Sequence, residues 1–342
     1  MTGSKPLDEC RVLCTPTTYG KGDPSLRSTL EAAVLEVVYN PLGRPLKAEE
    51  LRPLVTDADG FIAGLDEVDA SVIEAANRLR VIARYGVGTD RVDIGRATMR
   101  GIVVTNTPGT NSVAVAELTI GLILALARDL IAADDAVRLG EWPTFQGIGI
   151  RGKTVGLIGL GAVGREVARR LRAFGCRLLA FDPYVGPEVA DKYGVRLVSL
   201  ETLLPDADFV SLHAPAAEST IWMVNREFLQ KMKPGAFMIN TARGELVDEP
   251  ALIQALESRK VRAAALDCFS LEPPDKDSSL LKLPNVIVTP HIAAHTDEAV
   301  NLMGWAALEN CLAVLRGERP MNLVNPEVYE RSSSEVSNVR PS

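Results

Sequence analysis

The stretch TVGLI, residues 154–158, is followed at once by GLGAVG, residues 159–164. An apolar run before three glycines in the spacing G-x-G-x-x-G predicts a strand, a tight turn and the start of a helix. Gly159 permits the turn, Gly161 lets a phosphate approach the backbone, and Gly164 permits close packing of the helix on the strand. Free N–H groups at the helix start would face a pyrophosphate, so this stretch predicts a dinucleotide site.

An acidic residue farther along the chain strengthens this interpretation, since G-x-G-x-x-G alone also occurs in ordinary strand-to-helix turns. A second apolar run, residues 177–181, ends at Asp182, 18 residues after Gly164. An acid at about this place accepts hydrogen bonds from the ribose 2′-hydroxyl and would repel a 2′-phosphate. No arginine follows at once, only Pro183 and Tyr184. The sequence therefore predicts NAD rather than NADP.

The composition favours a folded protein with a small-molecule partner. The chain has 342 residues, of which 46% are hydrophobic, and this is enough for two domains of ordinary size. Its net charge of −7, without a basic run, argues against nucleic acid and anionic membranes as partners. The longest apolar helix expected, residues 113–127, contains Glu117 and is too short to span a bilayer.

Cysteine usage and the two ends of the chain predict a cytoplasmic protein. The five cysteines are odd in number, widely spread and without a C-x-x-C pair, so neither a disulfide framework nor a zinc ribbon fits. Residues 1–9 lack the apolar core of a signal peptide. Residues 331–342 hold three consecutive serines and little apolar content, and we expect a disordered tail there.

Apolar runs alternate with helical patterns on both sides of the glycine motif, which predicts an α/β protein with two doubly wound parallel sheets. We expect a Rossmann nucleotide domain, residues 110–295, inserted into a flavodoxin-like substrate domain, residues 1–109 with 296–330. The expected strands of the first sheet are residues 12–14, 35–38, 60–63, 80–83 and 102–105. Those of the second are residues 155–158, 178–181, 209–212, 237–240, 263–266 and 286–288.

Three groups of polar residues follow expected strands of the second sheet, where an open α/β sheet binds its ligands. Hydride transfer from an alcohol to NAD needs a base, a cation for the carboxylate or developing oxyanion, and a group that orients the base. His291 suits the base because histidine is the residue type whose unperturbed side chain changes charge near neutral pH. Arg243 suits the cation, since a guanidinium binds a carboxylate with two parallel bonds. Glu272 would stabilise the imidazolium and fix its tautomer.

The other two histidines leave different roles open. His213 follows a strand and would either line the cofactor cleft or cap the backbone. His295 lies four residues after His291, a spacing that resembles a zinc pair on one helix face. Pro290 precedes this pair, and no third ligand is evident, so the sequence predicts no metal site.

Several of these motifs, in this order, resemble the NAD-dependent D-2-hydroxyacid dehydrogenase family from about Arg11 to Glu327. The resemblance rests on residues 84–90, 106–109, the glycine loop with Asp182, residues 213–215, 240–244, 266–267 with 272–273, and 289–291. It implies reversible oxidation of a small (R)-2-hydroxy acid to the 2-keto acid, and a homodimer joined through the nucleotide domain. The implied catalytic residues are His291 as acid and base, Glu272 as its partner, and Arg243 as the clamp on the substrate.

The resemblance also implies the binding residues. The backbone around Val87 and Gly88 would hold the substrate carboxylate, beside Arg243 and His291. The expected cofactor-binding residues are Gly159, Gly161, Ala162, Val163, Gly164, Asp182, His213, Thr241, Ala242 and Asp267.

The chain is most similar to the phosphoglycerate dehydrogenase branch, and with few residues after Glu327 we expect no regulatory domain. Gly64 stands where a phosphate-binding arginine would be expected, so a hydroxypyruvate or glyoxylate reductase is the alternative. An alternative of another class is an NAD(H)-binding dimeric scaffold of corepressor type. The intact set of arginine, glutamate and histidine favours an enzyme.

Overall fold

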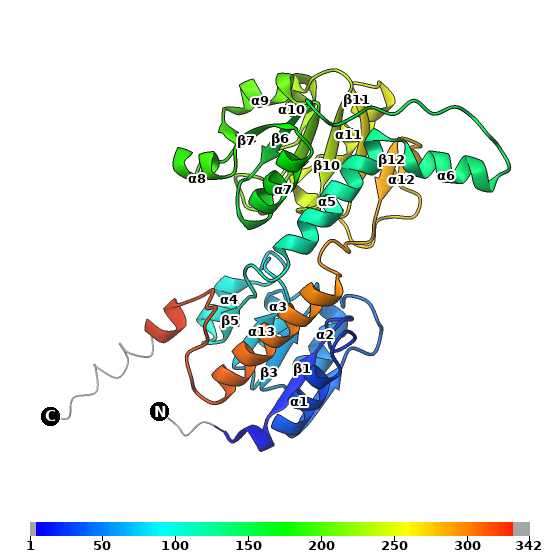
Figure 1. Cartoon of the computed structure of the whole chain (residues 1–342). Helices are drawn as coiled ribbons and strands as arrows, with labels where there is room; N and C mark the ends of the chain where they lie inside the picture. The colour runs from blue at the N-terminus through cyan, green and yellow to red at the C-terminus, as the bar shows by residue number, and fades with distance from the viewer. Residues whose placement is uncertain (1–4, 331–342) are drawn as a thin grey trace. The chain divides into compact units, whose positions relative to one another are not determined.

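Short apolar runs form two parallel sheets in the computed structural model of the protein, which describes residues 5–330 (Figure 1). Several strands are buried at every position, as expected where helices cover both faces of a parallel sheet. The chain divides into two units. The five-stranded unit takes its described residues from 5–111 and 295–330, and the seven-stranded unit comprises residues 112–294.

The five-stranded unit has the strand order β2-β1-β3-β4-β5, which is the flavodoxin-like order. Its strands are β1 (Arg11–Cys14), β2 (Glu36–Tyr39), β3 (Gly60–Ala63), β4 (Val81–Arg84) and β5 (Val103–Thr105). Its helices are η1 (Leu7–Glu9), α1 (Ser25–Ala33), α2 (Ala48–Val55), α3 (Ala70–Ala75), α4 (Ile94–Met99) and α13 (Asp297–Leu315). After α13, Leu323 bridges to Thr105 at the end of β5, so the last described segment is fixed to this sheet.

The seven-stranded unit has the order β12-β11-β10-β9-β6-β7-β8, a Rossmann order with one strand added. Its strands are β6 (Thr154–Ile158), β7 (Arg177–Phe181), β8 (Arg196–Leu197), β9 (Phe209–Leu212), β10 (Ala236–Asn240), β11 (Val261–Leu266) and β12 (Val286–Val288). Its helices are α5 (Ser112–Ala127), α6 (Leu130–Arg138), α7 (Ala162–Ala173), α8 (Pro187–Lys192), α9 (Leu200–Asp206), α10 (Arg226–Lys231), η2 (Gly244–Leu246), α11 (Glu249–Glu257) and α12 (Ser279–Lys282).

The predicted fold class is confirmed, because both sheets are parallel and doubly wound. The expected strands match the observed ones except at their ends, and β8 was missed. β8 is two residues long and only partly buried, so it leaves no apolar run in the sequence. The expected tail, residues 331–342, lies outside the described residues.

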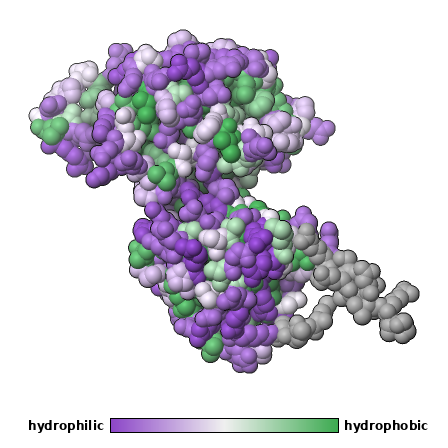
Figure 2. All heavy atoms as spheres, turned by 180° about the vertical axis from the view of Figure 1, so that it is seen from behind, coloured by the Kyte–Doolittle hydropathy of each residue, from purple (hydrophilic) through white to green (hydrophobic). Residues whose placement is uncertain are grey.

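Helix α6 extends away from the rest of the seven-stranded unit, and the chain returns from it without secondary structure (Figure 1). The helix and this return segment expose large apolar side chains, among them Leu130, Ile131, Val137, Leu139 and Trp142. No helix within residues 5–330 is long and apolar enough to cross a membrane. On the face drawn in Figure 2, apolar side chains are scattered among polar ones.

Candidate active site

The seven-stranded sheet aligns the ends of its strands, and all the polar residues singled out beyond Ile158 follow those ends. The pairing registers place in one row, from β7 to β12, Phe181, Ile158, Leu212, Asn240, Leu266 and Val288. Loops that start from one row of residues start side by side. The sheet therefore brings together segments that are more than 100 residues apart in the chain.

The glycine loop follows β6, and each of its three glycines has the steric role that the spacing predicts. Gly159 has φ +98°, and a Cβ there would lie 2.8 Å from the carbonyl carbon and oxygen of His213. A Cβ on Gly164 would lie 2.3 Å from the Gly159 carbonyl oxygen. At Gly161 a Cβ would meet nothing within 4 Å, so the protein leaves space there. Helix α7 begins at Ala162, and its first N–H groups have no acceptor within the helix.

Asp182 lies against this loop, at the end of the neighbouring strand β7. Its Oδ2 accepts a hydrogen bond from the Leu160 N–H at 2.8 Å, and its Oδ1 accepts one from the Tyr184 N–H at 2.9 Å. The carboxylate thus fixes the glycine loop, a role that the sequence analysis did not foresee. A carboxylate oxygen can accept more than one hydrogen bond, so it can still receive a ribose hydroxyl.

The backbone of His213, directly after β9, packs against the glycine loop at Gly159. Its N–H donates to the Ile158 carbonyl at 2.7 Å, and its Nε2 lies 3.0 Å from the Ser211 hydroxyl. Nδ1 is buried and has no hydrogen-bond partner among the described residues. Burial lowers the pKa of this imidazole to about 3, so the ring stays neutral near pH 7.

His291 and Glu272 form a pair in the loops after β12 and β11. His291 Nδ1 lies 2.9 Å from Oε1 and 3.0 Å from Oε2 of Glu272. Glu272 Oε1 also accepts a hydrogen bond from the Phe269 N–H at 3.1 Å, which fixes the carboxylate. The histidine backbone is left-handed, with φ +53°, a conformation that tertiary structure must impose on a residue other than glycine. The side chains of His291 and Glu272 are 22% and 14% exposed.

Asp267 holds the backbone that follows His291 and the Thr289 side chain that precedes it. Its buried carboxylate accepts hydrogen bonds from the Thr289 hydroxyl at 2.6 Å and from the Ile292 and Ala293 N–H groups at 2.9 Å each. From the sequence, Asp267 was predicted only to lie beside the cofactor. Its position directly after a buried strand was the available signal, but the partners come from residues 22 to 26 positions later.

The loop after β10 carries Arg243 and packs against the loop that carries Glu272. Asn240 is fully buried, and its amide donates to the Arg243 carbonyl at 2.7 Å and accepts from the Ala242 N–H at 3.0 Å. The Thr241 hydroxyl lies 2.8 Å from that of Thr119 on α5. A Cβ on Gly244 would lie 1.9 Å from the Phe269 carbonyl carbon.

Gly244 is therefore a residue that the sequence analysis missed as a structural requirement. Only a glycine lets the Arg243 loop approach the backbone at Phe269 so closely, and Glu272 is three residues farther on. Together these contacts bring the loops of Arg243, Glu272, Asp267 and His291 to one end of the sheet.

Val87 and Gly88 lie in the other unit, in the loop that follows β4. Val87 is 39% exposed. Neither residue donates a backbone hydrogen bond within the described part of the chain. The loop can therefore offer N–H groups to an anion.

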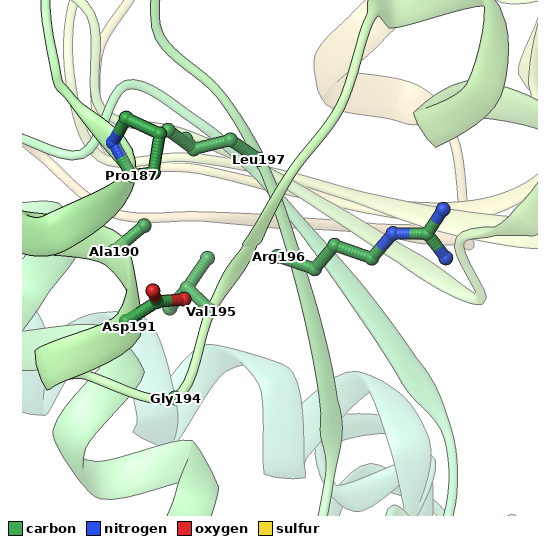
Figure 3. A pocket seen from close by; sticks show the side chains of 7 residues that line it. All are labelled: Pro187, Ala190, Asp191, Gly194, Val195, Arg196 and Leu197. Atoms are coloured by element: carbon green, nitrogen blue, oxygen red, sulfur yellow. The ribbon is translucent and has the colours of Figure 1, made fainter.

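The remaining candidates give no second site. His295 and His291 do not share a helix, since α13 begins only at Asp297. Within residues 5–330 no group of three or more histidine, cysteine or acidic side chains could hold a metal ion. Figure 3 shows a pocket of about 450 Å³ beside the edge strand β8, where Arg196 extends away from the other labelled side chains. No residue singled out from the sequence lines this pocket, and we assign it no role.

Comparisons with known proteins match most of the chain to dehydrogenases and reductases that act on 2-hydroxy or 2-keto acids. The sequence model of "D-isomer specific 2-hydroxyacid dehydrogenase, NAD binding domain" matches residues 120–293. A D-3-phosphoglycerate dehydrogenase from Archaeoglobus fulgidus is 47% identical over 271 residues, which cover 79% of this chain and 51% of that protein. A glyoxylate reductase from Thermofilum pendens is 43% identical over 316 residues, covering 90% and 93%.

Solved structures are also similar to most of the chain. The TT0316 protein from Thermus thermophilus superposes with a TM-score of 0.82 at 41% identity, and covers 92% of this chain and 99% of its own. The chain spans about half the length of the curated phosphoglycerate dehydrogenases that it matches.

Proposed function

Because the chain belongs to the D-isomer-specific 2-hydroxyacid dehydrogenase family, we propose that it interconverts a small (R)-2-hydroxy acid and its 2-keto acid with NAD. The observation that carries this proposal is the pairing of His291 Nδ1 with the Glu272 carboxylate. This pair lies at the same sheet end as the glycine loop of an NAD-binding domain. We assign NAD binding to residues 110–295, and the substrate-domain role to residues 1–109 with 296–330.

The glycine loop fits the pyrophosphate of NAD. We assign this group to the N–H groups at the start of α7 and to the space beside Gly161. Asp182 would receive the ribose hydroxyls and disfavour NADP. The neutral His213 supports a place near the cofactor without adding charge. Thr241, Ala242 and Asp267 are assigned to its nicotinamide end. When bound, NAD accepts the hydride that leaves the substrate carbon.

The chain's own residues move the proton and stabilise charge. Glu272 faces Nδ1 of His291, so Nε2 is the nitrogen left to accept the proton of the substrate hydroxyl. In the reverse direction the same nitrogen returns the proton to the carbonyl oxygen. Arg243 would bind the carboxylate and polarise the carbonyl. The hydrogen bonds that Asp267 accepts from the Ile292 and Ala293 N–H groups, just after His291, and from the Thr289 hydroxyl before it support a fixed position for this base.

We further propose that the N–H groups at Val87 and Gly88 bind the substrate carboxylate. A backbone loop with free N–H groups favours an anion, and it does so without a charged side chain. The support is that neither N–H is used within the described residues.

The surroundings of Gly64 favour a substrate without a phosphate, such as glyoxylate or hydroxypyruvate, over 3-phosphoglycerate. The Gly64 N–H donates to the buried Asp66 carboxylate at 2.9 Å. A Cβ at Gly64 would lie 3.2 Å from both that carboxylate and the Pro16 Cα. An acid and a tight backbone contact thus stand where a phosphate-binding arginine was expected.

A substrate panel with a base variant tests the proposed reaction. Wild type is assayed with NADH and glyoxylate, hydroxypyruvate or phosphohydroxypyruvate. His291→Ala should lower kcat by about 10²- to 10⁴-fold while NADH still binds, because a placed acid or base contributes about that much. His295→Ala removes the histidine four positions later and should retain kcat. Equal turnover by wild type and His291→Ala would contradict the mechanism. No turnover on any acid, with tight NADH binding, would favour the scaffold.

We propose a homodimer formed through α6 and the segment that follows it. The support is apolar exposure concentrated there, with Leu139 77% and Trp142 89% exposed. Trp142→Glu should shift the mass measured by light scattering toward the monomer. Met99→Glu, on an exposed residue of α4, is the matched control and should not. A monomeric wild type would contradict this part of the proposal.

We also propose a reducing, cytoplasmic location. The support is that all five cysteines are free thiols, four of them buried.

A further inference from the structure

Three successive carbonyl oxygens of the loop after β4, those of residues 86–88, accept hydrogen bonds from other residues of the five-stranded unit. The Gly86 oxygen accepts from the Thr107 N–H at 3.0 Å, and the Val87 oxygen accepts from the Asn106 side-chain amide at 2.8 Å. The Gly88 oxygen accepts from Nε of the buried Arg84 at 3.0 Å. Each of these three carbonyls thus has one donor.

Holding a carbonyl fixes the direction of the next N–H, because the two point in opposite directions across a trans peptide. The three donors therefore turn the N–H groups of Val87, Gly88 and Thr89 away from the protein atoms that hold the loop. None of the three donates a hydrogen bond within residues 5–330. Successive backbone N–H groups without an acceptor in the protein can form a concave site for an anion.

Of the three donors, only the Asn106 side chain can be replaced without the loss of another hydrogen bond among the described residues. The Thr107 donor is a backbone N–H, and Arg84 also donates to the Ala63 carbonyl at 2.9 Å. The backbone of Asn106 is itself fixed: its N–H donates to the Asn322 carbonyl, and its carbonyl accepts from the Asn310 amide, both at 3.2 Å. The chain after residue 295 therefore supports the residue that holds the loop.

We propose that Asn106 is a positioning residue for the substrate carboxylate. Its amide fixes the peptide between Val87 and Gly88, and this peptide's N–H faces the anion. The ligand class is a small carboxylate, and the inference rests on the proposed function. Asn106 acts through the loop, so its loss affects the binding of the acid and leaves proton transfer at His291 intact.

Steady-state kinetics with NADH and glyoxylate, and inhibition by oxamate, test this role in Asn106→Ala and in the isosteric Asn106→Asp. A hydrogen bond to a charged ligand contributes about ten- to a hundredfold in affinity. We expect KM for glyoxylate and Ki for oxamate to rise together by about tenfold or more. The changes in kcat and in Kd for NADH should be much smaller, since ground state and transition state share the carboxylate contact.

The matched control is Asn285→Ala, which removes an amide that donates to the Arg262 carbonyl at 2.9 Å, just before β12. It should leave KM unchanged. An active wild type whose two Asn106 variants keep the wild-type KM and Ki overturns this inference alone. A wild type that neither reduces a 2-keto acid nor binds oxamate overturns the proposed function, and the inference with it.

Discussion

Two loops at the ends of parallel strands present backbone N–H groups, and they are built in opposite ways. The glycine loop after β6 depends on missing side chains, because a Cβ on Gly159 or Gly164 would collide with backbone atoms. The loop after β4 depends on donors that hold its carbonyls, one of them the side chain of Asn106. The conformation of the first loop thus depends on the absence of side chains, and that of the second depends on hydrogen bonds.

This difference decides what a sequence can reveal. Steric demands within one short loop leave a fixed spacing of glycines. Hydrogen bonds to residues 84, 106 and 107 produce no fixed residue spacing in the sequence, because it is the sheet that brings these residues together. We expect the two loops to respond differently to substitution as well.

The largest effect should come from filling the glycine loop. Gly164→Ala places a Cβ 2.3 Å from a carbonyl oxygen and should lower both Tm and NADH affinity. Overpacking of this kind costs about 1–3 kcal/mol of folding stability. Gly161→Ala, whose Cβ meets no protein atom, should keep Tm and still weaken NADH binding. Calorimetry measures both quantities, and full NADH affinity in Gly161→Ala would contradict the assigned pyrophosphate position.

Removal of the carboxylate beside this loop should have the next largest effect. Asp182→Ala loses the acceptor of the Leu160 N–H and the group assigned to the ribose. We expect NADH affinity to fall about tenfold and the preference for NADH over NADPH to narrow. Asp182→Asn keeps an oxygen for Leu160 and separates the two roles. The ratio of kcat/KM for the two coenzymes is the measurement, and a wild type that prefers NADPH would refute the assignment.

A substitution on α13 should have a smaller effect on substrate binding by the loop after β4. Asn310→Ala removes the amide that donates to the Asn106 carbonyl, a bond worth about 1 kcal/mol. We expect KM for the keto acid to rise about two- to fivefold. Asn225→Ala removes the N-cap of α10 and should lower Tm without changing KM. A KM shift of equal size in both variants would show a general loss of stability instead.

The last expected effect is on folding stability rather than on binding, and it is a pH dependence that arises from His213. Its folded-state pKa, about 3, lies below the usual 6.5, so below pH 6.5 the unfolded chain takes up a proton that the folded chain does not. Its contribution to stability is therefore complete above pH 6.5 and is lost as the pH falls toward 3. Tm of wild type should fall more steeply between pH 7 and pH 5 than that of His213→Gln. Parallel Tm curves would contradict a neutral, buried ring.

Most strands and the fold class could be predicted because buried parallel strands are continuous apolar runs. Once the strands were predicted, the polar residues directly after them could be singled out, because an open α/β sheet binds its ligands at the carboxyl ends of its strands. β8 could not be predicted, because two half-buried residues carry no pattern. The backbone contacts of Asp267 and the requirement for glycine at residue 244 depend on which loops touch. Those contacts join residues distant in the chain.

Residue types and their spacing were enough to predict the glycine loop, its acid at Asp182, and the candidate set of Arg243, Glu272 and His291. Each of these signals is local, because it consists of a residue type at a fixed place after an apolar run. Two contacts became visible only in the folded chain: Glu272 faces Nδ1 of His291, and Asn106 holds the loop after β4. Both contacts join loops that follow different strands. Such contacts depend on strand order and register, and a local sequence pattern carries no information about either.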